Sequence, residues 1–153
     1  MRPTSHQTFL EIALVLSKRS TCKRRQVGCV AVDQYNYILS TGYNGVGKGL
    51  THCIDSPCPG SEYSSGEGLN ICEAIHAEQN ALLQCPNVMA IRKIYSTTSP
   101  CIHCAKLILN TGTREVFYLN KAYDIGAILL LHSAKIECTR IFMPDERFAD
   151  AGI

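Results

Sequence analysis

The second half of the chain alternates between helical and strand patterns, and this alternation limits most strongly the folds open to it. Six segments follow one another as helix, strand, helix, strand, helix and strand: residues 72–84, 93–97, 101–110, 115–119, 122–133 and 135–142. Strands that are joined by helices pair in parallel, and the helices then cover the sheet. We therefore expect a parallel section of sheet between layers of helix.

The first half of the chain adds one helix and two strands to this arrangement. Residues 5–18 carry apolar side chains at helical spacing, which predicts an amphipathic helix. Residues 27–32 are rich in β-branched side chains, and residues 37–41 follow after a short turn, so the two segments read as a hairpin. We predict an α/β fold of three layers, α/β/α, with a five-stranded mixed sheet in a single domain of residues 1–153.

A long stretch without periodicity separates the two halves. Residues 42–70 hold seven of the 11 glycines and two of the six prolines of the chain. A loop of this length inside one domain is usually functional or needs its own cross-link. We expect it to contribute to a binding site.

Charge and hydropathy exclude several classes of partner. A net charge of +2 is too small for a nucleic-acid-binding surface. The apolar stretch at residues 9–16 contains Glu11, unlike a signal-peptide core, and the longest apolar run, residues 125–131, is too short to span a membrane. We therefore predict a cytoplasmic protein, and in that compartment its nine cysteines favour metal binding over disulfides.

Two fragments, HAE and PCIHC, hold side chains suited to metal chemistry. His76, Cys101 and Cys104 offer one imidazole and two thiolates, and a catalytic zinc takes three such ligands and a water. The two cysteines begin a predicted helix, whose N-terminal end favours thiolates. Glu78 lies close to the metal without binding it, so it can move protons from the water to a ring nitrogen and assist the departure of ammonia.

A closed structural zinc site is the main alternative for these residues. Cys72 and His76 are four apart in the predicted helix and would share a face, so with the two cysteines of PCIHC they could form a Cys₃His site without room for water. That arrangement gives Glu78 no role, and we favour the catalytic site. His103, inside the same fragment, is expected to point away from the metal.

The two fragments, with their neighbours, resemble a known family. The segments C-x-x-x-HAEQNALL from residue 72 and SPC-x-x-CAK from residue 99 are similar to the deoxycytidylate (dCMP) deaminase branch of the cytidine deaminase superfamily. The fragments STC, VG, STGYNG and HC of the first half follow the order of that branch. The zinc motif alone is shared with deaminases of tRNA adenosine, guanine and riboflavin precursors, and GYNG narrows the resemblance to dCMP deaminases. The resemblance covers about residues 6–142 and implies a cytidine deaminase-like fold.

The resemblance implies a reaction and part of its machinery. The reaction is dCMP + water → dUMP + ammonia, in pyrimidine deoxynucleotide (dTTP precursor) synthesis. The resemblance implies a zinc-activated water that attacks C4 of cytosine, with Glu78 moving protons. The backbone at Ser99 would hold the exocyclic amine, and Tyr123 would contact the base or the ribose.

The resemblance also implies regulation. Members of the family are commonly activated by dCTP and inhibited by dTTP, and effectors bind at subunit interfaces of a homo-oligomer, often a hexamer. The effector-binding residues would be those of the GYNG loop: Gly42, Tyr43, Asn44 and Gly45. Taken alone, the same residues fit an ordinary Asn-Gly turn after a strand.

A nucleotide substrate needs a site for its phosphate. The only basic triplet of the chain lies at residues 23–25, just before a buried strand. Such a run is often a solvated face, but arginine can hold phosphate oxygens in a bidentate fork. We nominate Arg24 first and Arg25 second.

The remaining cysteines fall into two groups. Cys29, Cys85 and Cys138 lie in or next to predicted helices and strands and read as small core residues. The other four flank or lie within the long loop, and four thiolates complete a tetrahedral structural zinc site: Cys22, Cys53, Cys58 and Cys72. His52 could replace Cys58. By resemblance, some dCMP deaminases carry a second zinc with matching positions for three of these cysteines.

The sequence thus predicts a zinc-dependent dCMP deaminase with one catalytic and one structural zinc ion. Its partners would be a deoxynucleotide substrate and the effectors dCTP and dTTP, without nucleic acid or membrane. Two alternatives stay open: a bifunctional dCMP/dCTP deaminase and a non-catalytic zinc-binding interaction module. The small charge and the GYNG loop argue against a deaminase of bases within RNA.

Overall fold

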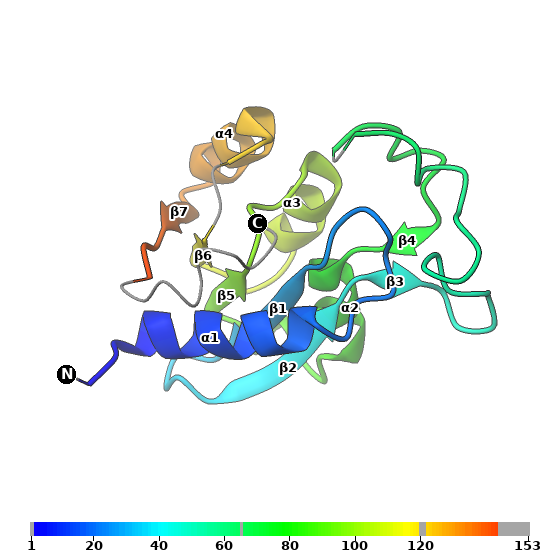
Figure 1. Ribbon diagram of the computed structural model, residues 1–153. Helices are drawn as coiled ribbons and strands as arrows, with labels where there is room; N and C mark the ends of the chain where they lie inside the picture. The colour runs from blue at the N-terminus through cyan, green and yellow to red at the C-terminus, as the bar shows by residue number, and fades with distance from the viewer. Residues whose placement is uncertain (1, 65, 120–121, 144–153) are drawn as a thin grey trace.

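A five-stranded sheet runs through the centre of the protein and carries helices on both faces (Figure 1). The computed structural model describes residues 2–64, 66–119 and 122–143. The strands are β1 (Gly28–Val32), β2 (Ile38–Tyr43), β5 (Lys93–Ser96), β6 (Glu115–Tyr118) and β7 (Glu137–Arg140). Strand β1 pairs antiparallel with both β2 and β5, whereas β5, β6 and β7 are parallel, in the order β2-β1-β5-β6-β7. The predicted five-stranded mixed sheet is confirmed.

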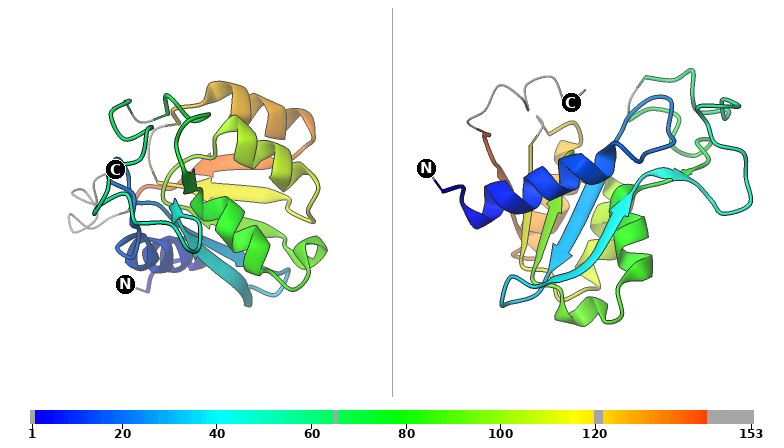
Figure 2. Two further views of the ribbon diagram at one scale, coloured as in Figure 1. Left: turned by 90° about the vertical axis from the view of Figure 1, so that its right-hand side faces the viewer. Right: turned by 60° about the horizontal axis from the view of Figure 1, so that its bottom comes forward.

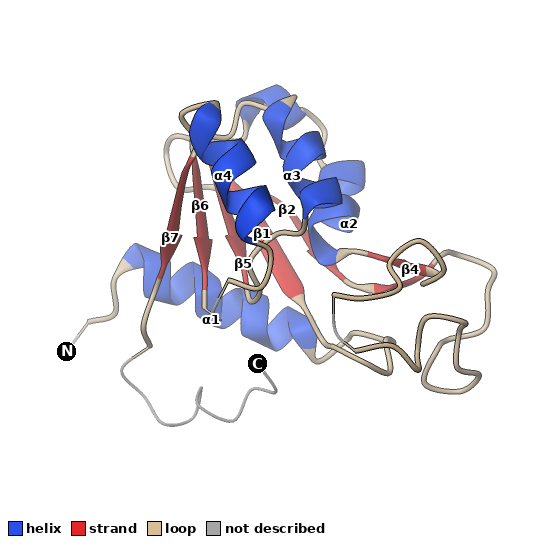
Figure 3. Ribbon diagram, turned by 90° about the horizontal axis from the view of Figure 1, so that it is seen from above, coloured by secondary structure: helices blue, strands red, loops and turns tan. Residues whose placement is uncertain are grey.

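The helices form a layer on each face of this sheet, as two further views show (Figures 2 and 3). Helix α1 (Ser5–Ser17) covers one face, and α2 (Ala77–Gln84), α3 (Ile102–Leu109) and α4 (Ile125–Ser133) cover the other. The short helix η1 (Val88–Ala90) precedes β5. Each face has its own buried apolar cluster, so the predicted three layers are confirmed.

Helix α1 is fixed at its start and along its length. The Thr4 side chain accepts a hydrogen bond from the Gln7 N–H at 3.1 Å, and the Gln7 amide oxygen accepts from the Thr4 N–H at 2.9 Å. Further along, the helix backbone approaches β1 so closely that a Cβ atom at Gly28 would lie 1.8 Å from the Ala13 carbonyl oxygen. Only glycine allows this contact. It places α1 directly against β1, the strand that follows the basic triplet.

The predicted helix at residues 72–84 begins too early. Residues 74 and 75 form β4 (Ala74–Ile75), which pairs antiparallel with β3 (Gly45–Val46) in a separate two-stranded sheet. His76 then has extended backbone, with φ −73° and ψ 156°, and α2 starts at Ala77. Long-range pairing with β3 therefore overrides the local helical pattern. It also shows that the long loop is not wholly irregular, since β2 continues to Tyr43 and β3 follows.

The other element boundaries differ less from the predictions. Helix α4 begins at Ile125, three residues later than predicted, and β7 covers only the middle of residues 135–142. Residues 120–121 and 144–153 lie outside the described residues, so the single-domain assignment of the whole chain stays a prediction. No helix in the described part of the chain has the length and apolar character that a membrane crossing requires.

Candidate active site and metal centre

The N-terminal ends of α2 and α3 bring three metal-binding side chains together. His76 is the N-cap residue of α2, Cys101 is the N-cap residue of α3, and Cys104 lies in the first turn of α3. The His76 Nδ1 atom is 3.4 Å from the Cys101 sulfur and 3.3 Å from the Cys104 sulfur. All three ligand atoms lie within 4.8 Å of one another, and both cysteines are 1% exposed. This donor set suits zinc.

The structure does not form the closed four-ligand alternative. Cys72 lies outside the helix that carries His76, and it is not a member of the three-residue group. Three protein ligands leave one position of a tetrahedral zinc ion open, as in catalytic sites. His103 is exposed and takes no part in the group, as the sequence predicts.

Hydrogen bonding and burial shift the pKa values of the two thiols in opposite directions. A hydrogen bond with the Cys104 thiol, together with His76, holds the pKa of Cys101 well below that of free cysteine. The pKa of Cys104 is raised, because its thiol is engaged by the Cys101 sulfur and is buried. The pKa of His76 is raised by its hydrogen bond to Cys101. A cation bound here would displace the proton from Cys104, since zinc takes cysteine as the thiolate.

The Glu78 carboxyl group lies beside the metal-binding group and is 5% exposed. Its Oε1 atom accepts a hydrogen bond from the Ser96 hydroxyl at 2.9 Å, and its Oε2 atom is 3.6 Å from the Cys104 sulfur. Burial raises the pKa of Glu78, although His76 opposes the shift. A carboxyl group with a raised pKa exchanges protons more readily near neutral pH. Glu78 therefore lies beside the three-residue group without belonging to it, and its role in proton transfer stays a prediction.

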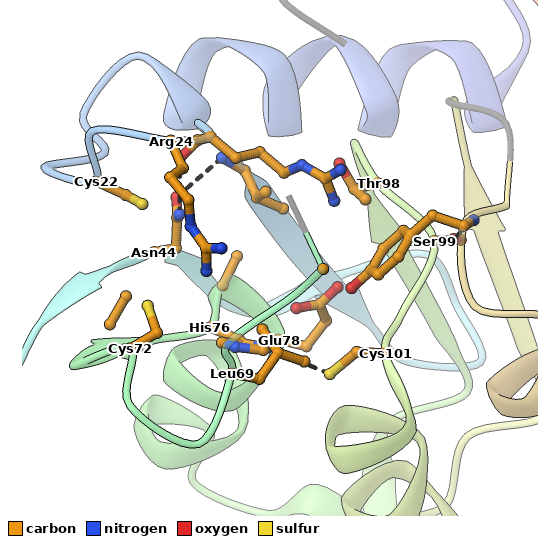
Figure 4. A pocket seen from close by; sticks show the side chains of 16 residues that line it. Cys22, Arg24, Asn44, Leu69, Cys72, His76, Glu78, Thr98, Ser99 and Cys101 are labelled. Atoms are coloured by element: carbon orange, nitrogen blue, oxygen red, sulfur yellow. Dashed lines mark hydrogen bonds between the residues drawn. The ribbon is translucent and has the colours of Figure 1, made fainter. Parts of the chain in front are cut away.

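A pocket opens above these residues. Its floor includes His76, Glu78 and Cys101, and its walls carry further polar side chains and Leu69 (Figure 4). Asn44 is buried in one wall, where its Oδ1 atom accepts from the Val27 N–H at 2.9 Å and its Nδ2 atom donates to the Arg25 carbonyl at 2.8 Å. The pocket therefore joins the candidate metal centre to the basic segment before β1.

Comparison with known proteins agrees with this geometry. The family model for the cytidine and deoxycytidylate deaminase zinc-binding region matches residues 3–120. This chain belongs to that family. It is 35% identical to the deoxycytidylate deaminase of Schizosaccharomyces pombe over 150 residues, which are 94% of this chain but 46% of that protein. It is 40% identical to the deoxycytidylate deaminase of Mycobacterium phage D29 over 125 residues, 76% of this chain and 95% of that one.

A solved structure supports the same assignment. The dCMP deaminase from the cyanophage S-TIM5, in complex with dCMP and dUMP, superposes with a TM-score of 0.71 at 26% identity. The superposition covers 92% of this chain and 99% of that one. The chain spans less than half the length of the S. pombe and Saccharomyces cerevisiae relatives that it matches. The family and its cytidine deaminase-like fold are thus shown.

Arg24 and Arg25, the two arginines that we nominate as phosphate ligands, make different contacts. The Arg24 Nη1 atom donates to the carbonyls of Tyr63, Ser64 and Glu67 at 3.2, 2.8 and 2.6 Å. The Arg25 guanidinium lies over the Tyr123 ring, 4.7 Å from its centroid. Both arginines line the pocket, and Arg24 also holds the long loop beside it. Their role as phosphate ligands stays a prediction.

Ser99 and Tyr123 lie next to each other at the pocket, and their roles in substrate binding stay predictions. Ser99 is 1% exposed, and its hydroxyl oxygen accepts a hydrogen bond from the Tyr123 N–H at 3.3 Å. Burial raises the pKa of Tyr123, and the negative charges of Cys101 and Glu78 add to the shift. Tyr123 therefore shares the pocket with Cys101 and Glu78.

The four predicted effector residues lie in three environments. Gly42 is buried against α2, and Asn44 lines the active-site pocket. Tyr43 and Gly45 instead line a second hollow of about 420 Å³. Its other lining residues are Arg19, Thr21, Val46, His52, Asn80 and Gln84. An effector role of this hollow stays a prediction.

The segment of residues 47–72, which we call the cysteine loop, gathers three of the four remaining candidate ligands. Burial raises the pKa of Cys58, but hydrogen bonds with the Glu73 and Gly60 backbone and with the Cys53 and Cys72 thiols lower it overall. Cys58 thus contacts both of the other thiols. Within the described residues, these sulfurs do not form a group with all atoms within 4.8 Å, so the second zinc stays a prediction.

Of the other two candidates, Cys22 lies before the cysteine loop and His52 lies within it. Cys22 is buried, and the residue before it accepts a backbone hydrogen bond from the Ile54 N–H at 3.2 Å. The His52 side chain is 55% exposed, with Nδ1 3.9 Å from an Asp55 carboxylate oxygen. Nothing in these contacts selects His52 over Cys58 as a ligand.

Two residues of the site escape the sequence prediction. Ser96 holds the Glu78 carboxyl group, and its position at the end of a buried strand carries no motif. Asp124 accepts hydrogen bonds from the N-terminal ends of both α3 and α4. An acidic residue directly before an apolar helical run is an N-cap signal, and it could have indicated half of this role.

Proposed function

We propose that this protein catalyses the zinc-dependent hydrolytic deamination of dCMP to dUMP and ammonia. One observation carries the proposal: a buried carboxyl group, Glu78, lies beside a three-ligand nitrogen and sulfur site at the floor of a pocket. The named deoxycytidylate deaminases among its relatives, and the S-TIM5 enzyme that binds dCMP and dUMP, support this substrate. The reaction would supply the thymidine nucleotide precursor dUMP in the cytoplasm.

His76, Cys101 and Cys104 would hold the catalytic zinc. When bound, the ion would lower the pKa of a water molecule and so supply the nucleophile for C4 of cytosine. The two sulfurs and one nitrogen fit zinc better than calcium or magnesium, which prefer oxygen ligands. The three residues are fixed at helix N-termini, so the ion would have a defined place relative to the pocket.

Glu78 would carry the protons of the reaction. It accepts a proton from the attacking water and delivers it to N3 of the ring as the C4–O bond forms. It then transfers the second proton of the water to the amino group, the C4–N bond breaks, and ammonia leaves. The Ser96 hydroxyl holds Oε1 of the carboxyl group in place during these transfers. The raised pKa of Glu78 suits a group that must both take and give a proton.

The pocket walls would bind the rest of the nucleotide. The backbone at Ser99 would accept a hydrogen bond from the exocyclic amine, and Tyr123 would pack against the base or ribose. Arg24 and Arg25 would neutralise the phosphate. Asn44, which the sequence suggests as an effector residue, faces the substrate pocket and would contact the nucleotide there.

We further propose activation by dCTP and inhibition by dTTP in a homo-oligomer, with a hexamer favoured. The hollow beside Tyr43 and Gly45 supports an effector site, because Arg19 and His52 offer basic groups to a triphosphate. The two hollows share one stretch of chain, since Asn44, which lines the substrate pocket, lies between Tyr43 and Gly45 in the sequence. A structural zinc at Cys22, Cys53, Cys58 and Cys72 would hold the cysteine loop.

The decisive experiment measures ammonia release from dCMP, dCTP, CMP and deoxycytidine by the zinc-loaded protein. We expect dCMP to be the best substrate, with turnover raised by added dCTP and lowered by dTTP. Comparable turnover of dCTP would support the bifunctional alternative. No turnover of any of the four would contradict the proposal and favour a non-catalytic zinc module. Elemental analysis of the same sample should find two zinc ions per chain, and one would contradict the second site.

A further inference from the structure

We propose that Asp124 is a positioning residue that ties the metal-ligand turn to the Tyr123 wall of the substrate pocket. Its carboxylate contacts the N-terminal ends of two helices at once. The Oδ2 atom accepts a hydrogen bond from the Ile102 N–H at 2.9 Å, and the Oδ1 atom accepts from the Ala127 N–H at 3.0 Å. This inference rests on the proposed function and names a residue that controls its metal and substrate sites together.

Helix α3 takes a hydrogen-bond acceptor for its first N–H group from outside its own segment. Helix N-termini leave backbone N–H groups unpaired, and the N-cap side chain usually accepts from one of them. Here the N-cap residue is Cys101, whose side chain makes no capping hydrogen bond because its sulfur faces His76. The first turn of α3 carries no acidic residue either. Asp124 supplies the missing acceptor at Ile102, the residue directly after the metal ligand.

The same residue fixes the adjoining wall of the pocket. Tyr123 precedes Asp124, and its N–H donates to the hydroxyl of Ser99, two residues before Cys101. Two backbone-to-side-chain hydrogen bonds therefore join residues 123–124 to residues 99–102. Beyond them, the Tyr123 ring is covered by Arg25, and a Cβ atom at Gly66 would lie 3.0 Å from its edge. A shift of Asp124 would thus move the ligand turn and the substrate wall relative to each other.

This arrangement predicts that one substitution weakens zinc binding and dCMP binding together. Residues that orient metal ligands without touching the metal typically change its affinity by about tenfold or more. The chemical step itself should change less, because Asp124 does not line the pocket and Glu78 keeps its Ser96 partner. The expected signature is weaker zinc affinity and a higher KM for dCMP, with kcat at saturating zinc and dCMP within about threefold.

The test separates this role from ordinary helix capping. Asp124→Ser keeps a good N-cap for α4, since serine is among the best N-cap residues, but its shorter side chain cannot also reach the Ile102 N–H. Asp124→Asn keeps one oxygen acceptor and should rescue part of the loss. The control is Thr4→Ala, which removes the N-cap of α1 far from the site. Zinc affinity is measured by competition with a chromophoric chelator, KM and kcat by ammonia release, and stability by thermal unfolding.

We expect Asp124→Ser to weaken zinc binding about tenfold and to raise KM for dCMP, and Thr4→Ala to lower only the unfolding temperature. Wild-type zinc affinity in Asp124→Ser would overturn the inference, as would an equal loss of zinc affinity in Thr4→Ala. Zinc competition needs no turnover, so its result stands even if the wild-type protein fails to deaminate dCMP. The two failures are therefore distinguishable.

Discussion

The metal centre and the cysteine loop are built by different means, although both face the same pocket. His76, Cys101 and Cys104 are placed by the starts of two helices that pack on the central sheet. The cysteine loop has no helix or strand among its described residues, 47–64 and 66–72, and contacts with side chains hold it. Arg24 donates to three backbone carbonyls of the loop, and Cys58 contacts the thiols of Cys53 and Cys72.

We expect the metal centre to carry out the reaction and the cysteine loop to determine how well the substrate binds. The groups that we propose for the reaction lie at the starts of packed helices, whereas the loop contributes Leu69, Gly66 and Cys72 to the pocket wall. Loops open at lower free energy than packed helices and strands. Substitutions at the metal centre should therefore remove turnover, and substitutions in the loop should alter substrate affinity and local stability.

The largest expected contrast is between one cysteine of each region. Cys101→Ser should remove the catalytic zinc and bring ammonia release below detection, because a serine hydroxyl is a poor zinc ligand. Cys58→Ser should lower the zinc content by one ion and make the loop sensitive to protease, while the catalytic zinc stays bound. Elemental analysis with limited proteolysis measures both. Loss of ammonia release in Cys58→Ser, or a protease-sensitive loop in Cys101→Ser, would break the division between the regions.

The next effect concerns proton transfer alone. Glu78→Gln should keep the zinc content but lower kcat for dCMP by about 10³-fold, within the range for loss of a general acid–base. Glu11→Gln, an exposed substitution on α1, is the matched control and should match the wild type. Retained turnover in Glu78→Gln would refute the role assigned to this carboxyl group.

The two arginines offer a smaller and more selective contrast. Arg24→Ala should raise KM for dCMP about tenfold and expose the loop to protease, since it loses charge-assisted hydrogen bonds to three carbonyls. Arg25→Ala should raise KM without exposing the loop. Lys23→Ala, at an exposed neighbouring position, is the control. Proteolysis at equal rates in the two arginine variants would show that Arg24 does not hold the loop.

The smallest effect tests the contact between the loop and Tyr123. Gly66 and Gly49 both have positive φ, +86° and +91°, so alanine strains the backbone at either position. A Cβ atom at Gly66 would lie 3.0–3.1 Å from the Tyr123 ring, whereas at Gly49 it would meet nothing within 4 Å. Gly66→Ala should raise KM about threefold, through a ring pushed from its rotamer, and Gly49→Ala should not. Equal KM values for dCMP in Gly66→Ala and Gly49→Ala would show that the loop does not contribute to the substrate site.

The two regions also differ in how well the sequence predicts them. The spacing of His76, Glu78, Cys101 and Cys104 is local and encodes their chemistry, so these residues are predictable before any fold is known. The helix–strand alternation likewise predicts the parallel part of the sheet. The prediction that this helix begins before Ala77 is wrong, because β4 pairs with β3, about 30 residues away. The local periodicity of the sequence does not indicate that pairing.

The contacts of the cysteine loop could not be predicted from the sequence. Arg24 binds backbone carbonyls, which every residue has, so no residue pattern marks its partners. Asn44 belongs to a motif that suggests an effector site, and the path of β2 and β3, which the motif does not reveal, brings it to the pocket that also includes His76 and Glu78. Asp124 shows an N-cap pattern for α4, while its second partner, Ile102, becomes visible only when the helices are packed.

The binding of a transition-state-like nucleotide tests the central claim most directly. A deoxynucleoside monophosphate whose pyrimidine ring carries a hydroxyl group on a tetrahedral C4 resembles the hydrated intermediate of deamination. By calorimetry, the zinc-loaded protein should bind it at least about 100-fold more tightly than dCMP, and the metal-free protein should lose this preference. Equal affinity for the two nucleotides, or binding unchanged by removal of zinc, would contradict a catalytic role for the metal centre.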